Sequence, residues 1–166
     1  LATPTARLMS DLLNLSKQNE LNLSETEIVD LRPLEAFQDL ERLDLSHTPI
    51  KNLFSLRQLR NLKYLNLSHT LIKDLEPLKY LTELDTLIID HTAIQSLAPL
   101  AKSTALRYLS CRKSGLRFAD AVVELESLTY FDLSHTPITR LPDLQENKAL
   151  HTLKADHSKL LSLPEF

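Results

Sequence analysis

A period of 22 residues is the feature that most constrains the fold of this chain. Apolar residues recur at this spacing from residue 18 onward, so the chain divides into seven segments, here called rungs. They begin at residues 18, 40, 62, 84, 106, 128 and 150, and the last is incomplete. Self-similarity at a fixed short period predicts a solenoid, in which each repeat stacks on its neighbours.

Within each rung, the apolar residues occupy fixed positions. Position 1 is Leu in every rung after the first, and position 14 is Leu in every rung except the fifth, which has Ala119. Position 4 reads Leu21, Leu43, Leu65, Leu87, Leu109, Phe131 and Leu153; position 6 reads Leu23, Leu45, Leu67, Ile89, Cys111, Leu133 and Ala155. Position 11 is Ile or Leu throughout, and position 17 is also apolar. These columns predict one continuous core.

Positions 3 to 7 alternate between outward and inward residues, which is typical of a short strand with positions 4 and 6 in the core. Seven such strands should form one parallel sheet. Pro33, Pro77 and Pro99 fall at position 16, where proline blocks a regular helix and favours short 3₁₀ or extended segments. Strands about 4.8 Å apart should line the concave face of a right-handed arc, an α/β solenoid.

Residues 1–17 do not follow the repeat. Thr3 and Pro4 read as the start of a helix, and the apolar residues that follow fall at helical spacing. A terminal rung needs a cap, so we expect two parts: an N-terminal helical cap over 1–17 and the repeats over 18–166. A helix that binds a partner is the alternative.

Charge and composition exclude several classes of function. The 166 residues carry 19 basic and 22 acidic side chains, a net charge of −3 that would recruit neither nucleic acid nor an anionic membrane. The sequence contains no apolar run near the ~20 residues of a membrane span. The lone Cys111 lies in a core column, which favours a buried hydrophobe over a reactive thiol. The compartment stays open between a cytosol, a bacterial surface and a secreted protein.

A histidine column repeats with the rungs. Position 8 holds His47, His69, His91, His135 and His157. A straight column supplies a line of imidazoles rather than ligands converging on one point, so we expect no metal and no cofactor. Mutual repulsion should lower the pKa values of the three consecutive histidines in rungs two to four.

Serine–histidine neighbours, beginning with Ser46 and His47, resemble part of a catalytic pair. Adjacent strand residues point to opposite sides, and no rung adds an orienting carboxylate with an oxyanion site, so we expect no enzyme. Thr or Ser occupies position 9 in every rung, and these hydroxyls should bond the backbone at the turn.

Rung five departs from the pattern. Cys111-Arg112-Lys113-Ser114-Gly115 replaces the usual Leu-Ser-His-Thr-Pro, and Gly115 is the only glycine in the chain. Two readings stay open: drift in one rung, with the turn re-set by glycine, and a binding feature.

The outward strand positions carry the candidate binding site. Position 3 holds three of the four tyrosines. Exposed Tyr and Arg anchor interfaces because they bury a large rigid area and keep a polar tip. The predicted partner-binding residues are Arg42, Tyr64, Ile88, Tyr108, Arg112, Tyr130 and Asp132. Acidic residues near the amino end and basic residues in rung five, including Arg107 and Arg117, would set a partner in register, unless they form an ordinary mixed-charge surface.

The seventh rung should present an open core edge. Leu150, Leu153, Leu160, Leu163 and Phe166 have no following rung to cover them. We expect either that the natural chain continues or that another chain covers this edge by self-association.

The rungs resemble the 22-residue subclass of leucine-rich repeats, as found in bacterial internalins and in the leucine-rich regulatory subunit of type 1 protein phosphatase. The resemblance covers residues 18–166, and the rung from Leu62 to Leu78 comes close to the family unit; position 9 departs, because the family usually has Asn there. It implies a non-catalytic module that binds a protein partner on its concave sheet. The alternative is a regulatory or targeting subunit that holds an enzyme such as a protein phosphatase.

Overall fold

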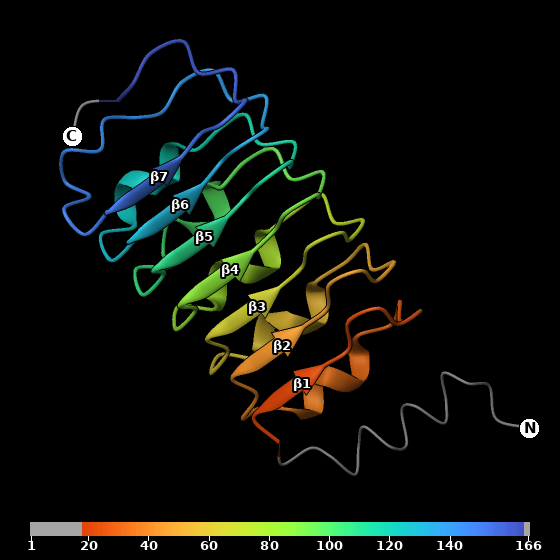
Figure 1. The fold of residues 1–166 in the computed structure, drawn as a ribbon. Helices are drawn as coiled ribbons and strands as arrows, with labels where there is room; N and C mark the ends of the chain where they lie inside the picture. The colour runs from red at the N-terminus through yellow and green to blue at the C-terminus, as the bar shows by residue number, and fades with distance from the viewer. Residues whose placement is uncertain (1–17, 165–166) are drawn as a thin grey trace, which may run out of the picture.

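Seven short strands run side by side in the computed structural model, which describes residues 18–164 (Figure 1). They are β1 (Glu20–Asn22), β2 (Arg42–Asp44), β3 (Tyr64–Asn66), β4 (Thr86–Ile88), β5 (Tyr108–Ser110), β6 (Tyr130–Asp132) and β7 (Thr152–Lys154). All pairs are parallel, and the strand order follows the chain. The expected helical cap over residues 1–17 lies outside the described residues.

Each strand covers positions 3 to 5 of its rung and is shorter than the expected positions 3 to 7. The backbone leaves the strand because position 8 has a positive φ in every rung, between 53° and 59°. The hydrogen bonds between rungs nevertheless continue past the strand: the N–H of Leu45 donates to Asn66 O at 2.9 Å, and that of His47 to Ser68 O at 2.8 Å. Stacked rungs therefore stay in register through the turn.

The return segments are 3₁₀ turns: η1 (Arg32–Ala36), η2 (Phe54–Gln58), η3 (Glu76–Tyr80), η4 (Ala98–Leu100) and η5 (Asp120–Glu124). Pro33, Pro77 and Pro99 stand in the first turn of η1, η3 and η4, as expected from their positions. Residues 18–164 contain no α-helix. The described part is therefore a parallel sheet alternating with 3₁₀ turns, without the α-helices that an α/β class implies.

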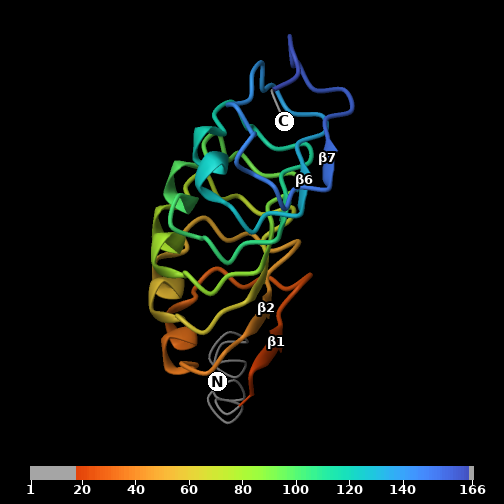
Figure 2. The same ribbon diagram turned by 90° about the vertical axis from the view of Figure 1, so that its left-hand side faces the viewer.

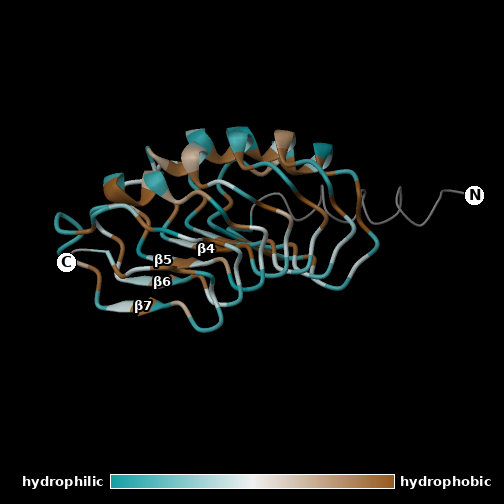
Figure 3. Cartoon of the chain, turned by 90° about the horizontal axis from the view of Figure 1, so that it is seen from above, coloured by the Kyte–Doolittle hydropathy of each residue, from teal (hydrophilic) through white to brown (hydrophobic). Residues whose placement is uncertain are grey.

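The strands and the 3₁₀ turns form two layers, which Figure 3 shows from above. The strands line the inner, concave side of the arc and the turns its outer side (Figure 2). The core fills the space between the layers, where leucines such as Leu40, Leu43 and Leu45 have no exposed surface. The concave sheet predicted from the strand spacing is confirmed.

The core contains one column that the sequence analysis missed. Position 20 is buried in rungs one to six and reads Phe37, Leu59, Leu81, Ser103, Leu125 and Asn147. Asn147 lies in this column with its Nδ2 donating to Val122 O at 2.9 Å and Leu125 O at 3.2 Å. These bonds to the preceding rung satisfy its amide nitrogen, whereas Oδ1 is buried without a hydrogen-bond partner in the described part of the chain.

Side-chain hydrogen bonds hold the turn after each strand. At position 9, Thr48 Oγ1 donates to Leu45 O at 2.6 Å, and the threonines of rungs one, three, four and six make the same bond. The expected role of these hydroxyls is confirmed. Gly115, however, does not re-set the turn in rung five, because its φ is not positive and Lys113 takes the left-handed position instead.

The seventh rung leaves its apolar side chains uncovered. Leu150, Leu153 and Leu160 are only partly buried, whereas Leu161 and Leu163 are 87% and 78% exposed. The expected open core edge is therefore present at β7, while Phe166 lies outside the described residues.

Candidate functional site

The concave face is built from the outward positions of the strands. The register pairs Arg42 with Tyr64, Tyr64 with Thr86, Thr86 with Tyr108 and Tyr108 with Tyr130. Position 3 therefore forms a straight row across β2 to β6, and the parallel pairing fixes each side chain beside its counterpart in the next rung.

Tyr108 and Tyr130 form the β5–β6 end of this row. Their rings stack with centroids 4.3 Å apart and planes 5° from parallel. The Tyr130 hydroxyl lies 3.3 Å from Asp132 Oδ2 and donates to it, and Lys154 Nζ lies 5.4 Å from the Tyr130 ring centroid. Both tyrosines are partly exposed. The pair is thus a rigid aromatic surface on the concave face.

The environment keeps these phenols protonated. Burial, the contact with Tyr130 and the nearby carboxylates of Asp90 and Asp132 raise the pKa of Tyr108 to about 12. Burial likewise raises the pKa of Tyr130, and Asp132 adds to the effect. The hydroxyls are therefore neutral donors at physiological pH, and they lie in a region of negative potential.

Arg42 and Tyr64 form a second pair toward the amino end. The guanidinium carbon of Arg42 lies 4.2 Å from the Tyr64 ring centroid, a cation–π geometry. Arg42 Nε also lies 3.5 Å from Glu20 Oε1. Two hollows of about 440 Å³ and about 360 Å³ flank this pair, and both are lined by Arg42 and Tyr64.

The three remaining predicted residues, Ile88, Arg112 and Asp132, have different roles. Ile88 is partly exposed at position 5 of β4 and cannot bond its own turn, as Asp44 and Asn66 do at this position in rungs two and three. Asp90 of rung four instead bonds the turn of rung five: its Oδ1 accepts from Ser110 Oγ at 2.6 Å and from the Arg112 N–H at 2.9 Å.

Arg112 itself is exposed, so its side chain is available to a partner. Asp132 is only 7% exposed, and it accepts from the Ser134 N–H at 2.9 Å as well as from Tyr130. It orients Tyr130 and the turn from below the surface.

Ion pairs between neighbouring rungs neutralise part of the expected charge separation. Glu41 lies 3.0 Å from Lys63, and Asp85 lies 3.6 Å from Arg107. Within residues 18–164, Arg112 and Arg117 form no such pair. The basic character of rung five therefore rests on its later residues.

The histidines and serines are not arranged for catalysis. Ser46 Oγ donates to Asp44 Oδ1 at 2.6 Å, and His47 is exposed at a φ of 56°. The imidazoles stack face to face, with centroids 4.2 Å apart for His47 and His69 and 3.9 Å apart for His69 and His91. No three His, Cys, Asp or Glu side chains in the described part of the chain gather as metal ligands would.

Two further titratable groups agree with the sequence analysis in part. The pKa of His91 is lowered, as expected, but burial contributes more than the repulsion from His69. Cys111 is fully buried, and this burial raises the pKa of its thiol well above the usual value, so it behaves as a core hydrophobe.

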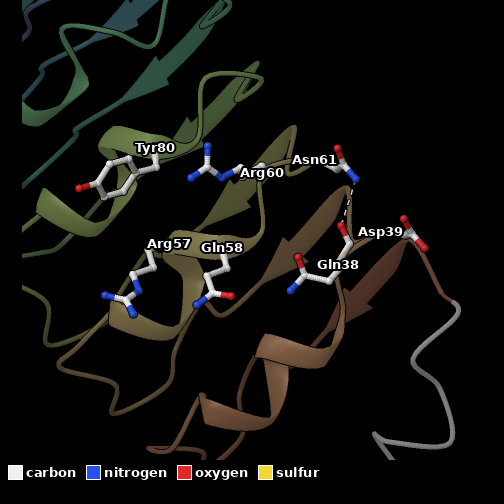
Figure 4. Close-up of a pocket in the computed structure, with 7 residues that line it drawn as sticks. All are labelled: Gln38, Asp39, Arg57, Gln58, Arg60, Asn61 and Tyr80. Carbon is white, nitrogen blue, oxygen red and sulfur yellow. Dashed lines mark hydrogen bonds between the residues drawn. The ribbon is translucent and has the colours of Figure 1, made fainter.

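A hollow of about 600 Å³ on the other side of the molecule was missed, because its residues follow no motif. It is lined by Gln38, Asp39, Arg57, Gln58, Arg60, Asn61 and Tyr80. These side chains come from η2, η3 and the loops after η1 and η2, and the guanidinium groups of Arg57 and Arg60 lie apart (Figure 4). Arg57 packs 3.8 Å above the ring of Phe54.

Comparison with known proteins identifies the repeats. A family model described as leucine-rich repeats (two copies) matches residues 38–80. No curated protein sequence matches the chain at a significant level. No helix within residues 18–164 is long and apolar enough to cross a membrane.

Solved structures share the fold. A leucine-rich-repeat protein from Leptospira interrogans is 24% identical with a TM-score of 0.83, covering 90% of this chain and 40% of that one. The functional domain of InlJ from Listeria monocytogenes is 22% identical with a TM-score of 0.79, covering 92% and 38%. Internalin C2 from Listeria monocytogenes is 30% identical with a TM-score of 0.70, covering 74% and 54%. The chain thus spans about half or less of each.

Proposed function

This chain is a leucine-rich-repeat protein, structurally similar to Listeria internalins, and on that premise we propose that it is a protein-recognition module. The partner binds on the concave sheet face. The observation that supports this most directly is the stacked pair Tyr108 and Tyr130, partly exposed on β5 and β6 of that face.

The geometry of the pair suits an interface anchor. Stacking and the Tyr130–Asp132 hydrogen bond already hold the rings, so a partner that covers them loses little further side-chain entropy. Two tyrosines also supply a large apolar area together with hydroxyl donors. Tyr64 and Arg42 extend the surface toward the amino end, and Ile88 and Arg112 extend it across rungs four and five.

The charges around the pair indicate what the partner presents there. The carboxylates of Asp90 and Asp132 lie close enough to raise the pKa values of both tyrosines, and Lys154 Nζ lies 5.4 Å from the Tyr130 ring centroid. An apolar or basic side chain of the partner therefore fits over the rings, since a cation gains from both the aromatic face and the carboxylates. An acidic side chain is disfavoured at this point.

The module is non-catalytic in this proposal. The fold is typically non-catalytic, and the hydroxyl of Ser46 is bonded to Asp44, with Ser68 bonded to Asn66 in the same way. The imidazoles of the same rungs stack on one another at an exposed edge. Neither group is poised to activate a nucleophile.

A pull-down with matched variants tests the site. The native chain and a Tyr108→Ala, Arg112→Ala, Tyr130→Ala variant are compared for the proteins that they recover from cell extract. Each anchor should contribute about 2 kcal/mol or more, so the variant should lose the partner. Circular dichroism checks that the variant keeps its fold.

The control removes the same types of side chain from the opposite side. An Arg57→Ala, Arg60→Ala, Tyr80→Ala variant should recover the partner as well as the native chain does. If the concave variant recovers the partner as well as the native chain does, the proposed site is wrong. Recovery of a phosphatase catalytic subunit would favour the alternative of a regulatory or targeting subunit.

A further inference from the structure

A second surface lies beside the concave sheet, at the loops that follow the strands. We name it the histidine edge and define it by His47, His69, His91, Pro49, Leu71, Ala93, Lys51 and Lys73. These residues occupy positions 8, 10 and 12 of rungs two to four. Hydrogen bonds between rungs hold the loops together: the Leu71 N–H donates to Ile50 O at 3.0 Å and the Ala93 N–H to Ile72 O at 3.3 Å.

The histidines are exposed and rigid. Their rings form a continuous stack, with interplanar angles of 13° and 18°. Each holds a φ between 53° and 57°, which costs a non-glycine residue on the order of 1 kcal/mol and suits Gly or Asn better. A flat aromatic surface is thus maintained at positions where a small residue would fold more easily.

An apolar hollow adjoins the stack. Its volume is about 640 Å³, and its lining includes His91, Leu71, Ala93, Lys51 and Lys73. Leu71 is 52% exposed and lines this hollow, so its apolar surface is open to a ligand there. A neighbouring hollow of about 490 Å³ shares Lys73 and Ala93 and continues the surface toward rung four.

The edge is basic although the chain carries a net charge of −3. Lys51 and Lys73 are exposed, and within residues 18–164 neither forms an ion pair. Asp74 lines both hollows and keeps its negative charge while its Oδ1 accepts the N–H of Glu76 at 2.9 Å, so Lys51 and Lys73 outnumber it by one. In rung five, Lys113 takes the histidine position and Arg117 the lysine position, so the basic row continues.

We infer that the histidine edge is a second binding surface, which takes an acidic peptide segment carrying an apolar side chain. The apolar side chain enters the hollow at Leu71, and the carboxylates meet Lys51 and Lys73. The segment packs along the imidazole stack. This surface has the opposite charge preference to the tyrosine pair, so the two recognise different segments, of one protein or of two.

Fluorescence anisotropy with defined peptides tests the inference. The probes are a labelled peptide of alternating Glu and Leu and its counterpart of alternating Lys and Leu. We expect saturable binding of the Glu peptide only. The Lys51→Glu, Lys73→Glu variant should weaken it about tenfold or more in Kd, and Leu71→Ser and the His47→Asn, His69→Asn, His91→Asn variant should weaken it too. Asn tolerates the left-handed backbone, so the last variant keeps its fold.

The controls separate this surface from general charge and from the concave face. Lys102→Glu with Lys148→Glu makes the same charge change elsewhere and should leave the affinity unchanged. Tyr108→Ala with Tyr130→Ala should also leave it unchanged, whatever becomes of the concave site. Equal binding of the two peptides, or an unchanged Kd in the Lys51 and Lys73 variant, would overturn the inference. Binding of phosphatidylserine vesicles without binding of the peptide would also overturn it and assign the edge to a membrane surface.

Discussion

At position 8 the rungs share a backbone conformation and not a residue type. Position 8 needs a left-handed conformation, and His47, Lys113 and Glu25 all adopt it. The histidine column is visible in the sequence but its conformation is not, because φ leaves no trace in apolar periodicity. Likewise, one of the two readings of rung five had Gly115 re-set the turn, whereas glycine there relieves crowding: an added Cβ would lie 3.2 Å from Ile94 O.

Acid should destabilise the fold through its histidines. The pKa of His91 is lowered by partial desolvation of its exposed ring and then by His69 and Lys113, and that of His135 by the same effect and then by His157. Because the unfolded chain then binds protons more readily, stability is full above about pH 6.5 and falls as the pH drops below it. We expect a lower Tm at pH 5 than at pH 7, measured by circular dichroism.

Replacing two histidines tests whether they cause the change in Tm between pH 7 and pH 5. His91→Asn with His135→Asn should flatten the change in Tm, since asparagine does not titrate. Asp30 cannot account for the change: its pKa is lowered from 3.8 by Arg32, so its contribution is lost only in stronger acid. A Tm that is equal at pH 7 and pH 5, or that falls as far in the variant, would contradict this explanation.

At the scale of the element, the 22-residue rung was predictable because its leucines repeat. The polar residues that occupy core positions in some rungs were not predictable. Pro33, Pro77 and Pro99 correctly indicated 3₁₀ turns. Strand length was overestimated, since alternation of side chains does not report where the backbone turns. Position 20 was overlooked because Ser103 and Asn147 interrupt its apolar character, and only their burial shows that they belong to the core.

The side chain of Asn147 should contribute more to the free energy of unfolding than an exposed asparagine does. Asn147→Ala removes two buried hydrogen bonds to the preceding rung and should lower the free energy of unfolding by about 2 kcal/mol. Asn61→Ala is the matched control: Asn61 Nδ2 also bonds the preceding rung, at Gln38 O and 3.0 Å, but it is exposed. Its loss should cost about 0.5 kcal/mol or less. Urea unfolding compares the two, and equal shifts would show that burial is not the cause.

For the whole molecule, the repeat determined the architecture and left the partner open. The concave sheet followed from strand spacing, and the row from Arg42 to Tyr130 followed from the outward columns. The pairing of Tyr108 with Tyr130 was not predictable in its geometry, nor was the burial of Asp132, because both depend on how side chains pack above a curved sheet. The sequence shows the histidines of the histidine edge as a column. That they belong to a surface follows only from the hollow beside them at Leu71.

Within residues 18–164, apolar side chains are exposed at the β7 end. Leu163 occupies position 14, a core column, and is 78% exposed, whereas Leu161 occupies position 12, which faces outward in the other rungs as well, and is 87% exposed. Apolar surface next to an open strand edge favours association between copies, although Lys154 and Lys159 oppose it. We therefore expect the chain to associate through this end at high concentration only.

Light scattering across a concentration series measures that association. The molar mass should rise above the 18.9 kDa of one chain as the concentration increases. Leu161→Lys with Leu163→Lys should keep the mass at that of the monomer, because it places charge on both exposed leucines. Val29→Lys changes a side chain that is 64% exposed at the other end of the solenoid, so it should associate like the native chain. A native chain that stays monomeric at every concentration would leave the β7 end without a role in self-association.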